Sequence, residues 1–474
     1  MYPLNLKQLQ HHFGGELICS ETESELEIKC LQIDSRQVQQ GDLFVALKGE
    51  RFDAHEFLAQ VIEQGAGFLV VSQPQKTTVP QWLVENTRIA LGQIAQLNRT
   101  LFTAPLIAIT GNSGKTTVKE MLGSILSQQR NTLITQGNFN NDIGVPLTLL
   151  RLDPQHQAAA IELGANHLGE IAYTTALAQP DVGVLLNVTG AHLGEFGSIE
   201  NIAQAKAELL SGLPEKACAV INADDSHCAY WLSCAGTRSV SLFTLETNMS
   251  HFWQSRNWPE SVSQVLSAQQ IQAQPSGCQF TLQSYDRGAI EPSLSAEIQL
   301  PALGLHNVAN ALAAAAAALS VGVTIAEIMA GLTAFSGIKG RLQQLSGLNG
   351  ACLINDTYNA NPGSVRAAID TLSAISGKKI LVLGDIGELG DAASSAHADL
   401  GRYAKDKGID QLYTVGTLSQ HASDHFGTGA QHLPDKVSLV EQLKRELSAN
   451  CTVLVKGSRS AAMETIVEPL QLQN

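Results

Sequence analysis

The stretch PLIAITGNSGKTTVKEMLGSILSQ occupies residues 105–128 and decides how the middle of the chain is expected to fold. Its apolar start predicts a buried strand, and its end predicts an amphipathic helix. Between them lies TGNSGKTT (110–117), in which Gly111 and Gly114 let the backbone turn until its N–H groups face a phosphate. The start of the following helix adds partial positive charge. Strand, glycine turn and helix together predict a phosphate-binding loop.

Two side chains of this loop have the chemistry that a nucleoside triphosphate requires. Lys115 can reach the β- and γ-phosphates, and the hydroxyl of Thr116 can bind Mg²⁺. The full phosphate-loop pattern has a glycine where this chain has Ile109, so a chance glycine turn is the alternative. The strand and the helix on either side favour the nucleotide. We predict that these residues bind ATP: Gly111, Asn112, Ser113, Gly114, Lys115, Thr116 and Thr117.

Composition restricts the class of protein. With 474 residues, 44% of them hydrophobic and 16% charged, the chain is expected to fold into two to four domains. A net charge of −14 argues against nucleic-acid binding, which needs a basic surface. Eight cysteines without a C-x-x-C pair argue against a zinc or redox motif and fit reduced thiols in the cytoplasm. We identify no signal peptide and no apolar run long enough for membrane insertion.

Short apolar runs alternate with helical patterns, which is typical of α/β units with parallel sheets. We expect three domains, over residues 1–86, 87–336 and 337–474, and short, less regular strands between about 237 and 300. The alanine-rich run from Ala311 to Leu319 predicts a tightly packed, buried helix. The expected strands lie in DLFVALKG (42–49), GAGFLVVS (65–72), PLIAIT (105–110), AAAIEL (158–163), VGVLLNV (182–188), CAVINA (218–223), ACLIND (351–356), KKILVLGD (378–385), QLYTVG (411–416) and CTVLVKG (451–457).

Three residues of the second block are candidates for a metal site or for catalysis. Glu162 ends a predicted strand beside the phosphate loop, where a carboxylate can hold Mg²⁺; a strand-end charge that meets solvent is equally compatible. His192 follows another strand and could face the same cleft, although a lone histidine is more often structural. Lys206 lies in a helical pattern and, without other information, would be a solvated lysine.

Polar loops of the third block also follow predicted strands. Arg341 lies at the entry to the domain, and NDTYNANPGS (355–364) is either a binding loop or an ordinary turn. In VKGSRS (455–460), Lys456 and Arg459 flank a glycine and a serine. Two cations in this arrangement can hold an anion, and a solvated basic loop is the alternative.

An ordered set of motifs extends over nearly the whole chain: DSR (34–36), GDLFVALKGERFDAHEF (41–57), TGNSGKTT, IELGANHLGEI, AHLGEFGS, AKAELLSGLP, HNVANALAAAA, GIKGR, DTYNANPGS, LGDIGELG and VKGSRSAAME. In this order the motifs resemble those of the Mur ligase family. The resemblance is weakest from about 237 to 300, and Asn355 and Thr357 stand where the family usually has Asp and Ser. It implies a three-domain α/β fold with a small UDP-substrate domain, a central P-loop ATPase domain with a parallel sheet and a C-terminal Rossmann-like domain.

The resemblance also implies roles for individual residues. The lysine that matches Lys206 is carbamylated in the family, which makes it an anion that helps to hold Mg²⁺ together with Thr116, Glu162 and His192. Lys115, Lys206 and His192 are the expected catalytic residues. The expected partners of ATP outside the loop are His306, Asn307, Asn310, Arg341 and Asp356. The expected substrate-binding residues are Asp34, Ser35, Arg36, Phe44, Ala46, Asn140, Asn141, Tyr358, Asn359, Asn361, Lys456 and Arg459.

The motifs are most similar to those of the family member that adds D-alanyl-D-alanine to UDP-N-acetylmuramoyl-tripeptide in peptidoglycan synthesis. That similarity implies a monomeric, cytoplasmic, ATP- and Mg²⁺-dependent amide-bond ligase that acts through an acyl phosphate. Two alternatives stay open at this point. Folylpolyglutamate synthase would share the ATP site but lack the N-terminal DSR and FVALKG motifs. A nucleotide-driven switch protein would hydrolyse ATP without a small-molecule acceptor.

Overall fold

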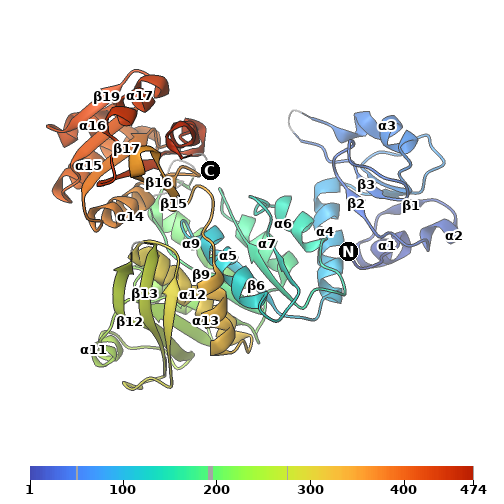
Figure 1. Cartoon of the computed structure of the whole chain (residues 1–474). Helices are drawn as coiled ribbons and strands as arrows, with labels where there is room; N and C mark the ends of the chain where they lie inside the picture. The colour runs from blue at the N-terminus through green and yellow to red at the C-terminus, as the bar shows by residue number, and fades with distance from the viewer. Residues whose placement is uncertain (50–51, 190–195, 275, 473–474) are drawn as a thin grey trace.

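The computed structural model describes residues 1–49, 52–189, 196–274 and 276–472, and its strands form three sheets. Figure 1 shows the N-terminal sheet (blue) and the C-terminal sheet (orange and red) on opposite sides of a central domain. Helices accompany each sheet, so the three-domain α/β architecture expected from the sequence is confirmed. The residues at which the domains were divided stay predictions.

The N-terminal sheet has five strands in the order β1-β5-β4-β3-β2. All neighbours are parallel except β1, which pairs antiparallel with β5. Two of the strands, β3 and β4, were expected from the sequence because they are apolar and buried throughout, whereas β1, β2 and β5 each contain a polar residue and give no apolar run. The elements are α1 (Leu6–Phe13), β1 (Glu16–Ile18), α2 (Glu21–Ser24), β2 (Leu31–Gln32), β3 (Leu43–Val45), η1 (Ala54–Phe57), α3 (Leu58–Glu63), β4 (Phe68–Val71) and β5 (Gln81–Leu83).

The central sheet has nine strands in the order β14-β13-β12-β11-β10-β9-β6-β8-β7. The run from β7 to β12 is parallel, so the carboxyl ends of these strands meet at one edge. Its strands are β6 (Leu106–Thr110), β7 (Thr132–Ile134), β8 (Ala158–Glu162), β9 (Val182–Leu185), β10 (Cys218–Asn222), β11 (Val240–Thr244), β12 (Val262–Gln274), β13 (Gly277–Asp286) and β14 (Leu294–Leu300). Its helices are α4 (Thr87–Leu101), α5 (Lys115–Leu126), α6 (Gly144–Leu149), α7 (Glu170–Ala178), α9 (Ile199–Gly212), α10 (Cys228–Ala235), α11 (Met249–Gln254), α12 (Leu305–Ser320) and α13 (Ile325–Ala334).

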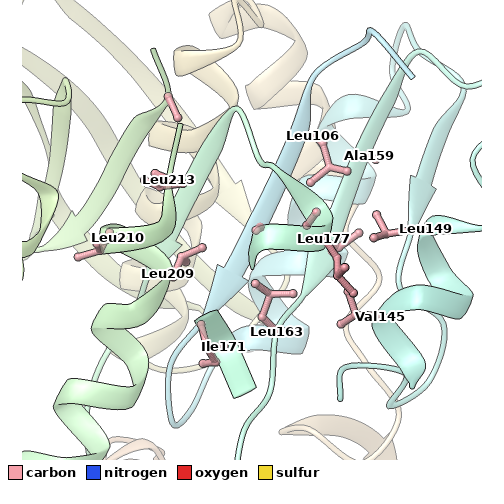
Figure 2. Packing of buried hydrophobic residues seen from close by; sticks show 14 of the residues in the cluster. Leu106, Val145, Leu149, Ala159, Leu163, Ile171, Leu177, Leu209, Leu210 and Leu213 are labelled. Carbon is pink, nitrogen blue, oxygen red and sulfur yellow. The ribbon is translucent and has the colours of Figure 1, made fainter. Parts of the chain in front are cut away.

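Helices cover both faces of the central sheet, which explains why its strands are apolar throughout. On β6, Ile107 and Ile109 pack with α5, α12 and α13, whereas Leu106 and Ala108 belong to the opposite core. Figure 2 shows that second core, in which Leu106 lies near Leu177 and Leu149. A strand held on both faces fixes the position of the loop that follows it.

The alanine-rich run forms most of α12 and is buried, as predicted. Small side chains let α12 approach α5 and the strands beneath it closely, because a methyl group takes little room between two backbones. The packing places the second turn of α12 beside the loop that precedes α5. At that point a Cβ on Gly114 would lie 2.5 Å from Asn310 Oδ1.

The region from about 237 to 300 differs from the short strands that we expected. After β11, a long antiparallel ribbon is formed by β12 with 13 residues and β13 with 10, and β14 pairs along it. The second half of β12 is polar and mostly exposed, so it loses the apolar pattern, whereas β13 and β14 alternate between more buried and less buried residues. The prediction of short strands was therefore wrong for β12 and β13.

The C-terminal sheet has six strands in the order β15-β16-β20-β17-β18-β19, parallel except for β15. The four strands expected from the sequence form its centre. The elements are β15 (Gln343–Ser346), η2 (Leu348–Gly350), β16 (Cys352–Asp356), α14 (Pro362–Ser373), β17 (Lys378–Gly384), η3 (Gly390–Ala392), α15 (Ala393–Asp406), β18 (Gln411–Val415), α16 (Gln420–Phe426), β19 (Ala430–Leu433), α17 (Lys436–Glu446), β20 (Cys451–Lys456), η4 (Arg459–Ala461), α18 (Glu464–Val467) and η5 (Glu468–Leu470).

Within the described ranges, no helix has the length and apolar character needed to cross a bilayer. All eight cysteines are free thiols. Burial raises the pKa of several of them, including Cys278 and Cys352, which keeps those thiols protonated and unreactive.

The contact between α13 and α5 gives a test of this packing. Replacing Gly331 by alanine would normally favour a helix, but here its Cβ would lie 2.3 Å from the Cα of Ile125. We expect Gly331→Ala to lower the free energy of unfolding by about 1–3 kcal/mol, as overpacking does. The measurement is a urea unfolding midpoint, with the exposed neighbour as control: Ala330→Ser should change stability by less than about 0.5 kcal/mol. A stabilised Gly331→Ala protein would contradict the close helix contact.

Candidate active site

The loop between β6 and α5 has the turn that its glycines predicted. Gly111 has φ 148° and Gly114 has φ 87°, both outside the range that other residues adopt readily. A Cβ on Gly111 would lie 3.0 Å from Leu186 Cβ, so neighbouring strands approach the loop closely. The first N–H groups of α5, which have no partner within the helix, belong to residues that line a cavity. This is the arrangement of a phosphate-binding loop.

Asn187, which sequence reasoning did not single out, fixes the loop from the adjacent strand end. Its carbonyl accepts from Asn112 N–H at 3.0 Å, and its side-chain oxygen accepts from Ser113 N–H at 2.9 Å. Its amide also donates to the Ser113 carbonyl at 3.0 Å. The sequence signal that could have indicated Asn187 is its position, as a polar residue directly after the apolar run VGVLL. Since β9 pairs with β6, the residue after β9 lies beside the loop after β6.

A cavity of about 920 Å³ lies at the carboxyl ends of the central strands and extends to the C-terminal domain. This is where parallel α/β sheets bind ligands. Of the predicted site residues, the cavity is lined by Asn112, Ser113, Gly114, Lys115, Thr116, Thr117, Asn140, Asn141, Glu162, Lys206, His306, Asn307, Asn310, Arg341, Asp356, Tyr358, Asn359, Asn361 and Lys456. The structure thus gathers most of the residues that the sequence analysis selected.

Thr116 joins the two domains at the centre of this cavity. Its hydroxyl donates to Glu162 Oε2 at 2.9 Å and accepts from Arg341 Nη2 at 2.9 Å. Arg341 also stacks over the Tyr358 ring, with 4.3 Å from its Cζ atom to the ring centroid. A second link between the domains runs from Asn361 Nδ2 to Ser113 Oγ at 3.2 Å. The C-terminal domain therefore contacts the phosphate loop directly.

Lys115 lies across the loop, where its Nζ donates to the Gly111 carbonyl at 2.7 Å. Burial lowers the pKa of Lys115, and the nearby charge of Arg341 lowers it further, whereas Glu162 opposes that shift. An additional anion such as a phosphate would favour the charged lysine. The site is therefore electrostatically suited to an anionic ligand.

The residues around Glu162 suit a hard cation. Its second carboxylate oxygen, Oε1, accepts from Asn140 Nδ2 at 2.9 Å, and Thr135 holds its backbone N–H at 3.0 Å. A carboxylate beside a threonine hydroxyl offers the oxygen ligands that Mg²⁺ prefers together with phosphate oxygens. In the part of the chain that is described, no group of three or more His, Cys, Asp or Glu residues could hold a metal without such help. His192 lies outside the described residues.

Lys206 is not the solvated lysine that its helical pattern alone would indicate. It lies on the inner face of α9, is 2% exposed and lines the cavity, with its Nζ 5.7 Å from the centroid of the Phe196 ring. Burial, and next the charge of Lys115, lower the pKa of Lys206 to about 7. A large part of its amine is therefore neutral, and nucleophilic, near neutral pH.

The start of α12 contributes three of the residues that were expected to bind ATP, His306, Asn307 and Asn310. Asn307 Nδ2 donates to the Leu303 carbonyl at 2.8 Å, and Asn310 Nδ2 donates to Asn307 Oδ1 at 3.1 Å. Burial lowers the pKa of His306 to about 4, so this ring is neutral at physiological pH. These groups form a polar, uncharged wall to one side of the phosphate loop.

The two cations of VKGSRS lie apart in the structure. Lys456 is buried and forms an ion pair with Asp356 at 2.6 Å, and it also donates to the Asn359 carbonyl. Arg459 is exposed, pairs with Glu464 at 2.9 Å and does not line the cavity. The single anion cradle that the sequence suggested is therefore not formed here, because each cation already has an acidic partner.

The N-terminal candidates also lie outside this cavity. Arg36 pairs with Asp34 at 2.7 Å, next to Ser35 at the surface of the N-terminal domain. Phe44 and Ala46 are fully buried in β3 and the loop after it. Their side chains form the core of the N-terminal domain, so they can support a substrate site there but do not present a surface to it.

Three family models match the chain in the order of its domains. They are the Mur ligase family catalytic domain over residues 27–99, the Mur ligase middle domain over 109–318 and the Mur ligase glutamate ligase domain over 340–459. The chain belongs to the Mur ligase family. The three models together include strands from all three sheets of this Mur ligase.

Individual relatives agree over the full length of this Mur ligase. It is 43% identical over 473 residues to the UDP-N-acetylmuramoyl-tripeptide–D-alanyl-D-alanine ligase of Escherichia coli strain K12, with 99% of each chain covered. The crystal structure of MurF from Acinetobacter baumannii superposes with a TM-score of 0.88 at 38% identity and covers 99% of both chains. The MurF ligase from Thermotoga maritima in complex with ADP has a TM-score of 0.81 at 26% identity, covering 93% of this chain and 96% of that one.

The lowered pKa of Lys206 gives a test of the site. Since its pKa is about 7, the neutral, reactive amine disappears as the pH falls below 7 and predominates above it. We expect acetylation by trace acetic anhydride, which reacts only with the neutral amine, to rise at Lys206 with a midpoint near pH 7, as measured by mass spectrometry of peptides. The exposed Lys216, modified in the same samples, is the control for the reactivity of the reagent. A midpoint for Lys206 that is not near pH 7 would contradict its buried environment.

Proposed function

We propose that this Mur ligase joins the amine of D-alanyl-D-alanine to UDP-N-acetylmuramoyl-tripeptide, with conversion of ATP to ADP and phosphate. The product is a UDP-muramoyl-pentapeptide for peptidoglycan synthesis. The 43% identity with the Escherichia coli ligase over 99% of both chains supports this substrate pair. The single observation in the structure that carries the proposal is the contact of Arg341 and Glu162 with the phosphate-loop residue Thr116. This contact between the two domains supports a nucleotide site formed by both of them.

The chemistry follows from the poor reactivity of a carboxylate. The peptide carboxylate attacks the γ-phosphorus of ATP, a P–O bond to ADP breaks, and an acyl phosphate results. The amine, after losing one proton, attacks the acyl carbon, and inorganic phosphate leaves as the amide forms. Phosphoryl transfer of this kind depends on positioning and on neutralising charge more than on covalent help from the protein.

Several residues of the cavity have proposed roles in the first step. The loop from Gly111 to Thr117 would hold the phosphates through backbone N–H groups and the helix start, and Lys115 would balance the charge of the γ-phosphate. Arg341 would approach the same phosphates from the C-terminal domain. His306, Asn307 and Asn310 would form the wall beside the adenine.

Thr116 and Glu162 would hold Mg²⁺, and we include His192 and a carbamylated Lys206 in this proposed set. Bound Mg²⁺ would lower the repulsion between the carboxylate and the triphosphate. The neutral amine of Lys206 supports carbamylation, because only an unprotonated amine adds carbon dioxide. The change would replace a buried cation by an anion near Lys115 and relieve the repulsion between the two lysines.

Substrate contacts are proposed on two sides of the nucleotide. The N-terminal domain, with the surface residues Asp34, Ser35 and Arg36, would hold the UDP moiety over the core that contains Phe44 and Ala46. The cavity wall from the C-terminal domain would receive the acceptor. Its proposed residues are Asn140, Asn141, Tyr358, Asn359, Asn361 and Lys456. Asp356 supports this wall through Lys456, and Arg459 would reach the cavity only after its loop moved.

The two alternative functions receive less support. The agreement with Mur ligases includes the N-terminal domain over residues 27–99, which folylpolyglutamate synthase was not expected to share. A switch protein would not need the wall of acceptor-side amides that line the cavity. We further propose that the enzyme acts as a monomer in the cytoplasm, where its free thiols stay reduced.

Lys115 gives the sharpest test of the nucleotide site. We expect Lys115→Ala to reduce the rate of ligation at least 100-fold, because a charge that stabilises the transferring phosphoryl group is lost. Phosphate release and pentapeptide formation are the measurements. The circular dichroism spectrum should stay as in the wild type, and the exposed Lys216→Ala should keep full activity. Turnover by Lys115→Ala at the rate of the wild type would contradict the assignment of the loop.

Omission of each substrate tests the ligase against an ATPase switch. We expect phosphate release only when ATP, the UDP-muramoyl-tripeptide and D-alanyl-D-alanine are all present, because the amine must consume the acyl phosphate for turnover. Sustained release without the dipeptide would argue for the switch.

A panel of tripeptides with lysine or diaminopimelate at position three, followed by mass spectrometry of the product, identifies the preferred peptide.

A further inference from the structure

Lys119 is a buried cation to which the chemistry described above gives no role. It lies on α5, one helical turn after Lys115, and its side chain is 1% exposed and does not line the cavity. Its Nζ donates to the Thr135 carbonyl at 2.8 Å and pairs with Glu120 Oε1 at 2.6 Å. Because a lysine is almost never fully buried unless it is paired, these two partners indicate what the residue does.

Thr135 is the residue at which the chain leaves the central sheet. It follows β7, and its N–H still donates to the Ala160 carbonyl of β8 at 3.2 Å. In a regular parallel ladder, the Thr135 carbonyl would then accept from the N–H of Glu162. Here the Thr135 hydroxyl accepts from that N–H, at 3.0 Å. The side chain of Thr135 thus replaces its own carbonyl in the ladder.

The displaced carbonyl is the one that Lys119 binds. Thr135 is buried, and a buried carbonyl almost always needs a donor. Because β7 is an edge strand of the described sheet, the donor comes from the helix above it. The helix lies close enough, since a Cβ on Gly123 of α5 would be 3.1 Å from Ile134 Cγ2 on β7. Lys119 therefore stabilises the turn that takes the chain out of the sheet.

The segment that follows this turn lies against Glu162. Several residues of 136–142 line the cavity. Among them, Asn140 donates from Nδ2 to Glu162 Oε1 at 2.9 Å, and its carbonyl accepts from the Gly164 N–H at 2.7 Å. The Thr135 hydroxyl thus holds the backbone of Glu162, and Asn140 holds its carboxylate. Both contacts depend on the path of the chain at Thr135.

Helix α5 therefore acts on Glu162 along two routes. Thr116, in the first turn of the helix, contacts the carboxylate oxygen Oε2 directly. Lys119, in the second turn, acts through Thr135 on the backbone N–H of Glu162. Through the segment after Thr135 it also acts on the other carboxylate oxygen, Oε1. One helix thus fixes both oxygens of the carboxylate.

We propose that Lys119 is a positioning residue that holds Glu162 in the orientation needed to bind the divalent cation of the nucleotide. The inference rests on the proposed function, because that function supplies the cation as a ligand of Glu162 and Thr116. Lys119 itself contacts neither the nucleotide nor the cation in this scheme. Loss of a group that orients a metal ligand typically lowers metal affinity about 10- to 100-fold.

Lys119→Met keeps the length of the side chain and removes the donor. We expect the Kd of Mn²⁺ for the protein with bound ADP to rise about 10-fold. The measurement is a titration followed by the electron paramagnetic resonance signal of free Mn²⁺, with ADP alone as the blank. The Kd of ADP in EDTA should stay that of the wild type, because Lys115 and the glycine turn are unchanged.

Substitutions at Thr135 test the same link without altering the helix. Thr135→Val removes the hydroxyl that accepts from the Glu162 N–H and should raise the Kd of Mn²⁺ as Lys119→Met does. Thr135→Ser keeps a hydroxyl and should bind Mn²⁺ as the wild type does. In the double variant of Lys119→Met and Thr135→Val, the rise should be smaller than the product of the two single effects, because both substitutions break one chain of contacts.

Glu120→Gln is the matched control on the helix. It removes the ion pair of Lys119 and keeps the bond to Thr135, so the Kd of Mn²⁺ should not change. A rise as large as that in Lys119→Met would overturn the proposal, because the ion pair and not the bond to Thr135 would then matter.

The other outcomes separate this inference from the function on which it rests. An unchanged Kd of Mn²⁺ in Lys119→Met or Thr135→Val overturns the proposal, and so does an equal loss of ADP binding in EDTA, which would show a general distortion of the phosphate loop; the ligase function stands in both cases. If Lys119→Met does not fold, Thr135→Val and Thr135→Ser decide the question. If the wild type binds no Mn²⁺ beyond that bound by ADP alone, the proposed metal site itself fails.

Discussion

The hydroxyl of Thr116 is the point on which the arrangement of the cavity depends. It donates to Glu162, at the end of a central strand, and accepts from Arg341, at the start of the C-terminal domain. One side chain therefore sets the distance between a phosphate loop, an acidic group suited to a metal and a cation from another domain. The loop itself is held by Asn187 from the next strand. The positions of the phosphate loop, Glu162 and Arg341 are therefore all fixed relative to the central sheet.

The second feature of the cavity is its buried positive charge. Burial lowers the pKa of both Lys115 and Lys206; the charge of Lys115 lowers the pKa of Lys206 further, and the charge of Arg341 does the same to Lys115. Protein interiors tolerate such a set only when anions compensate it. The polyphosphate of a nucleotide supplies that compensation at Lys115, and conversion of Lys206 to an anion would supply it from within the protein. The same excess of buried positive charge therefore favours both a polyphosphate ligand at Lys115 and the conversion of Lys206 to an anion.

The sequence predicted elements whose signal is local. The strand before Gly111 and the buried alanine helix had patterns that tertiary contacts did not alter. Strands were expected in the region of β12, but the length of β12 was underestimated because its second half is polar and mostly exposed. In the site, Asn187 and the separation of Lys456 from Arg459 depended on which strands become neighbours and which acids lie nearby. Which strands become neighbours and which acids lie nearby depends on the order of the strands in each sheet. Residue spacing in the sequence alone does not reveal that order.

The helix α4 shows that the N-terminal and central domains are parts of one cooperative body. Thr87 Oγ1 donates to the Ala46 carbonyl on one side, while the buried Asn98 side chain bonds to Tyr2 N–H and to the Leu149 and Leu152 carbonyls. Ala90, Leu91 and Ile94 belong to an apolar core that extends into both domains. Cutting the chain before this helix would expose apolar surface on both pieces. The Ala46 carbonyl and Tyr2 N–H on one piece, and the Asn98 side-chain oxygen on the other, would lose their hydrogen-bond partners. Shortened versions of the protein for crystallography or screening should therefore keep these two domains in one polypeptide.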